Sequence, residues 1–245
     1  MPAPTPDQRL AEADPPLTPV IMYQEWRHLR FLHWRIPATQ IQSRLPAGLH
    51  VDTFDGSAWL GIVPFKMARV RPRFLPCVPG LSDFLELNLR TYVYDDQGRP
   101  GVWFFSLDAN QALAVLIARK AFNLPYEVAA MQSLKSQGEL IYQSRRKSDS
   151  VEQSFRYPLQ PTNAQISSPD TLEFFLLERY RLFAETKSGQ IISGQVHHEP
   201  YEFAPCEVPA YSTRLFELNG FEAPSNPPES VLLANPVKVQ IHPMG

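Results

Sequence analysis

The sequence predicts an α+β fold in which an antiparallel sheet curls into a barrel or forms two stacked layers. Three observations support this prediction. Strand-like runs are joined by hairpin turns such as Asp55-Gly56 and Ser188-Gly189, two stretches have helical spacing, and strands and helices do not alternate regularly. With 245 residues, of which 44% are hydrophobic, the chain is long enough to form one large β-rich domain.

The expected domain covers residues 20–245 and follows a disordered tail. Residues 1–19 are rich in Pro and Ala and have no hydrophobic periodicity, which is typical of a mobile segment. The first residues contain no apolar signal segment, and no run approaches the roughly 18 apolar residues of a membrane helix. We therefore expect a cytoplasmic protein without a membrane partner. In that compartment Cys77 and Cys206 would be reduced, although a disulfide between them stays an alternative.

The first strand signals lie between residues 20 and 70. Residues 21–36 are dense in apolar groups, and residues 37–49 predict one or two helical turns. The hairpin at Asp55-Gly56 leads into residues 57–70, where neither face is polar, so this strand is expected to be covered on both sides. Gly61 in its middle predicts a bend or the close approach of another backbone.

The second half of the expected sheet begins with a hairpin between residues 84–93 and 101–107. Asp108 and Gln111 form a capping-box pattern, which predicts a helix over residues 110–122. The remaining expected elements are strands within residues 127–147 and 152–159, a helix capped by Ser168 over 169–180, a hairpin over 181–200 and a last strand over 236–241.

Residues 84–93, with the sequence FLELNLRTYV, alternate strictly between apolar and polar side chains. One side carries Leu85, Leu87, Leu89, Thr91 and Val93, and the other carries Glu86, Asn88, Arg90 and Tyr92. Because the neighbouring strands are apolar on both faces, this part of the sheet should be buried, and buried charges must be paired or must line a wet cavity. We predict that Glu86, Asn88 and Arg90 line a binding cavity. A purely structural network of Glu86 and Arg90, or a solvated sheet face, are the alternatives.

Several other chemistries have little support in the sequence. The formal charge of −2 gives no general attraction to nucleic acid, and the dense basic stretch of Arg69, Arg71 and Arg73 is expected to be an ordinary solvated strand end. Glycine-rich phosphate loops, GxSxG, HExxH and CxxC motifs do not occur. His197 and His198 would point to opposite faces of a strand. We therefore expect neither a metal site nor a cofactor, and no nucleic-acid partner.

Five segments, in the same order, resemble a known family. They are FLHWRIP, LPAGLHVDTFDGSAWLGIVPF, ELNLRTYV, ARKAFNLPY and VHHEPY. Together they look like the bacterial YqjF-like domain of unknown function, over roughly residues 22–240. That family is placed in the acetoacetate decarboxylase-like superfamily. The resemblance implies a cone-shaped antiparallel β-barrel with packed helices, an internal pocket and self-association into homo-oligomers.

The same resemblance implies where the site residues lie. In acetoacetate decarboxylase the motif runs Gly-Arg-Glu, then Gly, an apolar residue, Pro and two lysines, of which the first forms a Schiff base. Its arginine matches Arg119, its nucleophilic lysine falls on Tyr126 and its second lysine on Glu127, while Lys120 occupies the place of the motif's Glu. A phenol cannot form an imine, so the resemblance implies loss of Schiff-base chemistry. The pocket acid of the decarboxylase falls on Glu86.

Two functions of different classes follow. The first is a barrel that binds a small anionic or carbonyl-bearing ligand through Glu86, Asn88, Arg90, Arg119 and Tyr126. The second is an enzyme of decarboxylase, lyase or hydrolase type acting on small oxo acids or related lipophilic carboxylates. In it, Glu86 would act as acid or base, and Tyr126 or Arg90 would stabilise an oxyanion. A scaffold that acts through protein contacts is a weaker third possibility.

Overall fold

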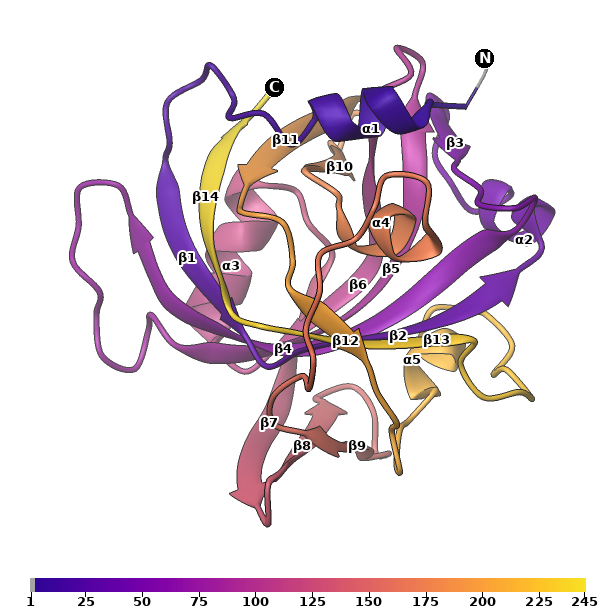
Figure 1. The fold of residues 1–245 in the computed structure, drawn as a ribbon. Helices are drawn as coiled ribbons and strands as arrows, with labels where there is room; N and C mark the ends of the chain where they lie inside the picture. The colour runs from indigo at the N-terminus through magenta and orange to yellow at the C-terminus, as the bar shows by residue number, and fades with distance from the viewer. Residues whose placement is uncertain (1–2) are drawn as a thin grey trace.

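A computed structural model describes residues 3–245, and one large sheet dominates its fold (Figure 1). The expected α+β class is observed, with 14 strands and short helices among these residues. The strands are β1 Met22–Arg27, β2 Leu29–Ile36, β3 Leu49–Val51, β4 Ala58–Pro72, β5 Phe84–Asp95, β6 Pro100–Ala109, β7 Tyr126–Ser136, β8 Glu139–Arg146, β9 Gln153–Pro158, β10 Arg181–Glu185, β11 Ile191–His197, β12 Phe203–Pro205, β13 Ser230–Ala234 and β14 Val237–Met244. The helices are α1 Pro6–Ala11, α2 Ala38–Gln42, α3 Ala112–Ala121, α4 Leu172–Leu177 and α5 Arg214–Leu218.

The strand pairings form a closed circuit. From β4 they run through β5, β6, β10, β11, β14 and β1, and β1 pairs with β4 again. Strand β2 pairs with the first part of β4 on the same edge as β1, opposite β5, and β13 and β12 continue the sheet from β2. Strands β7, β8 and β9 extend away from the circuit at its lower end in Figure 1. The circuit therefore encloses an inner face. Strand β5 is one of its members and has a partner strand on each edge.

The prediction of a purely antiparallel sheet is wrong at two pairings. Strand β6 pairs in parallel with β7 and also with β10. For the pair of β6 and β7, the physical reason is the crossover connection. The chain leaves β6, forms α3, and returns to start β7 in the same direction, as a parallel pair requires. The sheet is therefore mixed.

The predicted turns are confirmed, although one strand has a different partner. Asp55 and Gly56 have φ angles of 50° and 71°, as a two-residue hairpin turn of type I′ requires. The strand before this turn, β3, nevertheless pairs with β5 and not with β4. Both edges of β4 are already occupied beside the turn, because β2 pairs with Ala58–Ile62 and β5 pairs from Leu60 onward.

The predicted helices exist, but their caps differ. The side chain of Gln111 caps α3, whereas Asp108 lies in β6 and binds Arg146 at 2.7 Å. Helix α4 is capped by the Thr171 side chain and is shorter than expected. The Ser168 carbonyl accepts a hydrogen bond from the Thr171 hydroxyl. In both cases the sequence contains two candidate caps close together, and the structure uses the second.

The first residues do not form a free tail in this structure. Thr5 and Gln8 make a reciprocal capping box at the start of α1. On the same helix, Arg9 is buried and binds Asp52, which lies beyond β3. The predicted disorder of residues 1–19 is thus wrong for α1, because one buried ion pair ties this polar segment to the domain; Met1 and Pro2 lie outside the described residues.

The two faces of β5 meet different surroundings. Leu85, Leu87 and Leu89 pack in an apolar cluster that includes Tyr142 of β8 and Phe155 of β9. The opposite face is directed to the inside of the circuit. The strict alternation of the sequence thus separates a packed core from the region described in the next subsection.

Replacing Gly61 with Ala is expected to destabilise the fold by about 1–3 kcal/mol, as overpacking of a tight core does. A Cβ atom at Gly61 would lie 2.8 Å from Cδ2 and Nε2 of His33. A histidine side chain, and not the predicted backbone, thus makes the close approach. His33 is fully buried and hydrogen-bonded to the Tyr92 hydroxyl at 2.6 Å, so it cannot move away cheaply. Urea unfolding measures the loss, and Gly245→Ala, whose Cβ would meet nothing within 4 Å, is the control. Equal stability of both variants would contradict this prediction.

Candidate functional site

A cavity of about 430 Å³ lies inside the circuit of strands. Every strand of the circuit contributes to its wall, and most of the lining side chains are apolar. Along β5, four alternate residues line it: Phe84, Glu86, Asn88 and Arg90. Since strand residues rise about 3.3 Å each, this row is about 20 Å long. The polar side of FLELNLRTYV therefore faces a hollow, and the alternative of a solvated sheet face does not apply.

Glu86 is held by two neighbours inside the cavity. The Tyr126 hydroxyl donates to Oε2 of Glu86 at 2.7 Å, and the Asn88 amide donates to Oε1 at 3.3 Å. Tyr126 is the first residue of β7 and reaches Glu86 because β7 pairs in parallel with the end of β6. All three residues line the cavity. An acid and an amide of one predicted segment and a phenol of another thus form one hydrogen-bonded group.

Burial raises the pKa of Glu86 to about 7, and the nearby carboxylate of Asp108 adds to this increase. The hydrogen bonds from Tyr126 and Asn88 act in the opposite direction because they favour the charged form. Burial and the charge of Glu86 raise the pKa of Tyr126 well above its ordinary value. Glu86 can therefore exchange a proton near neutral pH, while Tyr126 stays a neutral hydrogen-bond donor.

Arg90 lies four residues further along β5 and has only uncharged partners. Its Nη2 atom donates to the carbonyl of Leu176 at 2.9 Å and to the Tyr92 hydroxyl at 3.2 Å, and its guanidinium lies 5.1 Å from the centre of the Phe31 ring. Within residues 3–245, no carboxylate lies within ion-pair distance of it. The alternative of a direct Glu86–Arg90 pair is therefore not observed. Tyr92 itself donates to the same carbonyl at 2.8 Å and does not line the cavity.

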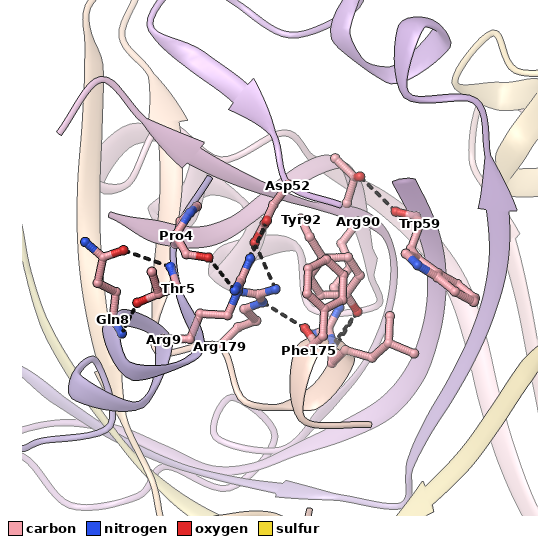
Figure 2. A network of polar contacts seen from close by, with 12 residues as sticks. Pro4, Thr5, Gln8, Arg9, Asp52, Trp59, Arg90, Tyr92, Phe175 and Arg179 are labelled. Carbon is pink, nitrogen blue, oxygen red and sulfur yellow. Dashed lines mark hydrogen bonds and ion pairs between the residues drawn. The ribbon is translucent and has the colours of Figure 1, made fainter. Parts of the chain in front are cut away.

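A charged network that the sequence patterns did not predict borders the end of the cavity beyond Arg90 (Figure 2). The carboxylate of Asp52 is fully buried and binds Arg9 of α1 through two hydrogen bonds and Arg179 through a third, at 3.1 Å. Arg181, two residues further on, binds Glu12 at 2.9 Å. Arg179 and Arg181 both line the cavity. Their alternation in "RYRLF" is the same signal that identified the polar side of β5 and could have indicated them.

Arg119 and Lys120 lie outside the cavity wall. Arg119 donates to the backbone carbonyl of Tyr126 at 2.5 Å and pairs with Glu127 at 3.0 Å, so its direct contact with a ligand is not supported. Lys120 belongs to the last turn of α3 and does not line the cavity. The geometry gives Arg119 the role of holding the start of β7, and thereby Tyr126, in place.

His197, His198 and the two cysteines do not line the cavity. His198 is buried between the rings of Tyr180 and Tyr201, whereas His197 contacts the carbonyl of Ala13. Cys77 and Cys206 are free thiols.

Among residues 3–245, no helix is both long and apolar enough to cross a bilayer.

Comparison with known proteins identifies the family. Residues 23–238 match the family model DUF2071, described as an uncharacterized conserved protein. The chain belongs to the DUF2071 family. This DUF2071 protein is also 38% identical, over 209 residues and 85% of each chain, to "Uncharacterized protein YqjF" of Bacillus subtilis (strain 168). The resemblance noted from the sequence motifs is thus confirmed.

Solved structures share the fold of this DUF2071 protein at low sequence identity. Acetoacetate decarboxylase of Legionella pneumophila superposes with a TM-score of 0.60 at 14% identity, covering 94% of this chain and 88% of its own. The enduracididine biosynthesis enzyme MppR, in complex with the condensation product of pyruvate and imidazole 4-carboxaldehyde, gives 0.63 at 13% identity, with 94% and 90% covered. MppR was also solved in complex with pyruvate. At these identities the comparison establishes an acetoacetate decarboxylase-like fold.

We expect the wild-type protein to lose stability as the pH rises from about 4.5 to about 7, and the Glu86→Gln variant to lack this loss. The folded-state pKa is about 7 and the ordinary value is 4.5, so between these values the folded protein holds more protons than the unfolded chain. The contribution of Glu86 is therefore largest below the ordinary pKa and falls as the pH rises towards about 7, by about 3 kcal/mol in total.

The measurement is the difference in free energy of unfolding between Glu86→Gln and wild type, taken by urea titration across this pH range. The stability of the variant relative to wild type should increase with pH and level off above about pH 7. Other titrating groups are common to both proteins and cancel in the difference. A difference that does not change with pH would show that Glu86 keeps an ordinary pKa.

Proposed function

We propose that this protein binds a small anionic or carbonyl-bearing molecule in the cavity, in contact with Glu86, Asn88, Arg90 and Tyr126. The observation that carries this proposal is the convergence of these polar groups on a mainly apolar hollow, which is the usual form of a small-molecule site. Two of their buried atoms, Asn88 Oδ1 and Arg90 Nε, have no hydrogen-bond partner in the described part of the chain. Buried polar atoms are nearly always paired, so these two are suited to a guest.

The proposal includes loss of the Schiff-base chemistry of acetoacetate decarboxylase. Its support is the tyrosine at position 126, where the resemblance places the nucleophilic lysine, together with the position of Lys120 outside the cavity wall. Tyr126 instead donates a hydrogen bond to Glu86. In this proposal Arg119 acts only through the Tyr126 backbone.

We also propose that the circuit of strands corresponds to the cone-shaped barrel of the decarboxylase-like fold, within one domain of residues 20–245. The order of the pairings and the TM-scores near 0.6 support this assignment. The chemical class of ligand has separate support, because MppR, which has the same fold, was solved with pyruvate, a small anion that carries a carbonyl group. A cytoplasmic location and homo-oligomers stay predictions.

A thermal-shift screen of short carboxylates, 2-oxo acids and 3-oxo acids tests the binding proposal. Members that bind should raise the melting temperature of the wild-type protein, because a ligand that binds only the folded state stabilises it by mass action. The increase should be smaller for Asn88→Leu, which removes the polar amide beside Glu86 and keeps a similar volume. Gln132→Leu is a matched control on the exposed part of β7, away from the cavity. If no compound shifts wild type, the binding proposal is wrong.

The second candidate function is acid–base catalysis on oxo acids through Glu86. The specific observation that favours it is the pKa of about 7, which suits a group that takes up and releases a proton at neutral pH. Tyr126 and Arg90 would then stabilise negative charge on a substrate oxygen. This candidate uses the same cavity and differs only in the fate of the ligand.

Incubation with oxo acids in heavy water distinguishes this candidate from simple binding. If Glu86 acts as a base, protons next to the carbonyl should exchange for deuterium, as observed by NMR, and Glu86→Gln should lower the rate by about 100-fold or more. Parallel incubation with borohydride should leave Lys120 unmodified. A reduced adduct on Lys120 would establish an amine mechanism and overturn the proposed loss of Schiff-base chemistry, and exchange that persists in Glu86→Gln would exclude Glu86 as the base.

A further inference from the structure

The far end of the cavity carries an excess of positive charge. Arg9 and Arg179 share the single carboxylate of Asp52 (Figure 2), and Arg90 has only uncharged partners, so one ion-paired carboxylate is set against three guanidinium groups in this region. Arg181 does not change this balance because Glu12 neutralises it. An arginine stays protonated even when buried, and an unbalanced buried charge is costly. This end of the cavity is therefore electrostatically suited to an anion.

Two of these arginines also present free donors there. Arg90 Nε and Arg179 Nη1 are buried atoms without a hydrogen-bond partner among residues 3–245. Both residues are more than nine-tenths buried, and both line the cavity. Their guanidinium groups lie 5.5 Å and 5.2 Å from the centre of the same ring, that of Tyr92. Both guanidinium groups therefore lie near Tyr92 on the cavity wall, and each keeps an unused N–H group, the kind of donor that a carboxylate accepts.

The nearby acids do not compensate this charge. Glu178 is buried near this region, but it accepts hydrogen bonds from the Tyr180 hydroxyl and from the backbone N–H of Tyr201, and it forms no ion pair with an arginine in the described chain. Glu86 lies at the other end of the polar row, and a carboxylate placed beside it would be repelled whenever Glu86 is ionised. An anionic group of a ligand is thus favoured at Arg90 and Arg179 and disfavoured at Glu86.

The opposite end of the cavity is apolar and open. Five residues both line the cavity and are 40 to 57% exposed; we call them the apolar rim: Leu75, Val78, Leu81, Leu113 and Ile117. They come from the loop between β4 and β5 and from α3, which lie on the same side of the sheet in Figure 1. Phe74, in the same loop, is 87% exposed. Contiguous exposed apolar groups at the mouth of a cavity are typical of a ligand entrance.

We infer that the ligand is an amphipathic monocarboxylate, whose carboxylate binds Arg90 and Arg179 and whose unbranched apolar chain runs along β5 to the apolar rim. The distance allows this: the row from Arg90 to Phe84 is about 20 Å long, and the rim continues it to the surface. This inference rests on the proposed function and narrows it from small anions in general to lipophilic carboxylates with a chain of this length.

Isothermal titration of the full chain with the saturated acids from butanoate to dodecanoate, each below its micellar concentration, tests the inference. Each added methylene should tighten binding by about fourfold as long as the chain stays inside the cavity, the factor that corresponds to burial of one CH₂ group. Each acid should bind about tenfold or more tightly than the primary alcohol of equal length, because only the acid makes charge-assisted hydrogen bonds.

Matched variants separate the two ends. Arg90→Met, of similar length, should remove the preference for acid over alcohol, and Arg90→Lys should retain part of it. Ile117→Ser on the apolar rim should weaken only the longest acids, whereas Leu134→Ser, which changes an equally exposed leucine of β7 away from the cavity, should have no effect. Melting curves of the free variants check that each one folds. If Arg90→Met does not fold, Arg90→Lys and the chain-length series on wild type decide the question.

The outcomes are distinguishable from failure of the proposed function. If short acids bind and longer chains bind no more tightly, this inference is wrong while the proposed function stands, and the apolar rim is then a contact surface for another protein chain. If alcohols bind as tightly as acids and Arg90→Met has no effect, the assignment of the carboxylate is wrong. If neither these acids nor the oxo acids of the thermal-shift screen bind, both this inference and the proposed function fail.

Discussion

The polar side of β5 is the constraint on which the rest of this structure depends. The strand is buried along its whole length, so its carboxyl, amide and guanidinium groups cannot reach bulk water. Burial of such groups is tolerated only if each has a partner or a polar space. Two neighbouring elements meet this requirement. The Tyr126 hydroxyl of β7 donates a hydrogen bond to Glu86, and the Leu176 carbonyl near the end of α4 accepts one from Arg90. The polar atoms that these partners leave unpaired, Asn88 Oδ1 and Arg90 Nε, belong to residues that line the cavity.

Much of this could be predicted from local sequence patterns. The period of two in residues 84–93 correctly separates the leucines that pack in the core from the residues that face the cavity, and the Asp55-Gly56 turn follows from its need for positive φ. Both properties depend only on neighbouring residues. The alignment of Tyr126 with Glu86 required the family resemblance, because β5 and β7 are far apart in sequence.

Other features depend on contacts that no local pattern contains. The parallel pairs of β6 depend on where the chain returns after α3, and the pairing of β3 with β5 depends on which edges of β4 are occupied. The residues around Arg9 are polar and rich in proline, so their composition resembles a mobile tail. Only the distant carboxylate of Asp52 makes this arginine a buried residue. Arg119 shows the opposite limit of sequence reasoning. The resemblance aligned it with the arginine of the decarboxylase motif, but its side chain donates to the backbone carbonyl of Tyr126 and does not line the cavity.

The proposed loss of Schiff-base chemistry concerns one position of a shared fold. Acetoacetate decarboxylase of Legionella pneumophila and this DUF2071 protein share the fold, and in this chain the phenol of Tyr126 donates to Glu86. In the proposed alignment, this phenol takes the place of the decarboxylase's amine. A neutral phenol donor beside an acid with a pKa of about 7 favours reversible binding and proton exchange over covalent capture.

Helix α1 has a practical consequence for work on this family. It covers the cationic end of the cavity, and Arg9 supplies part of the charge that surrounds Asp52. A truncation that starts at Val20, chosen because the preceding residues look dispensable, would uncover Asp52 and Arg181 at once. Work on the ligand therefore needs the N-terminal residues, because a shortened N-terminus would alter the cavity whose occupant is to be identified.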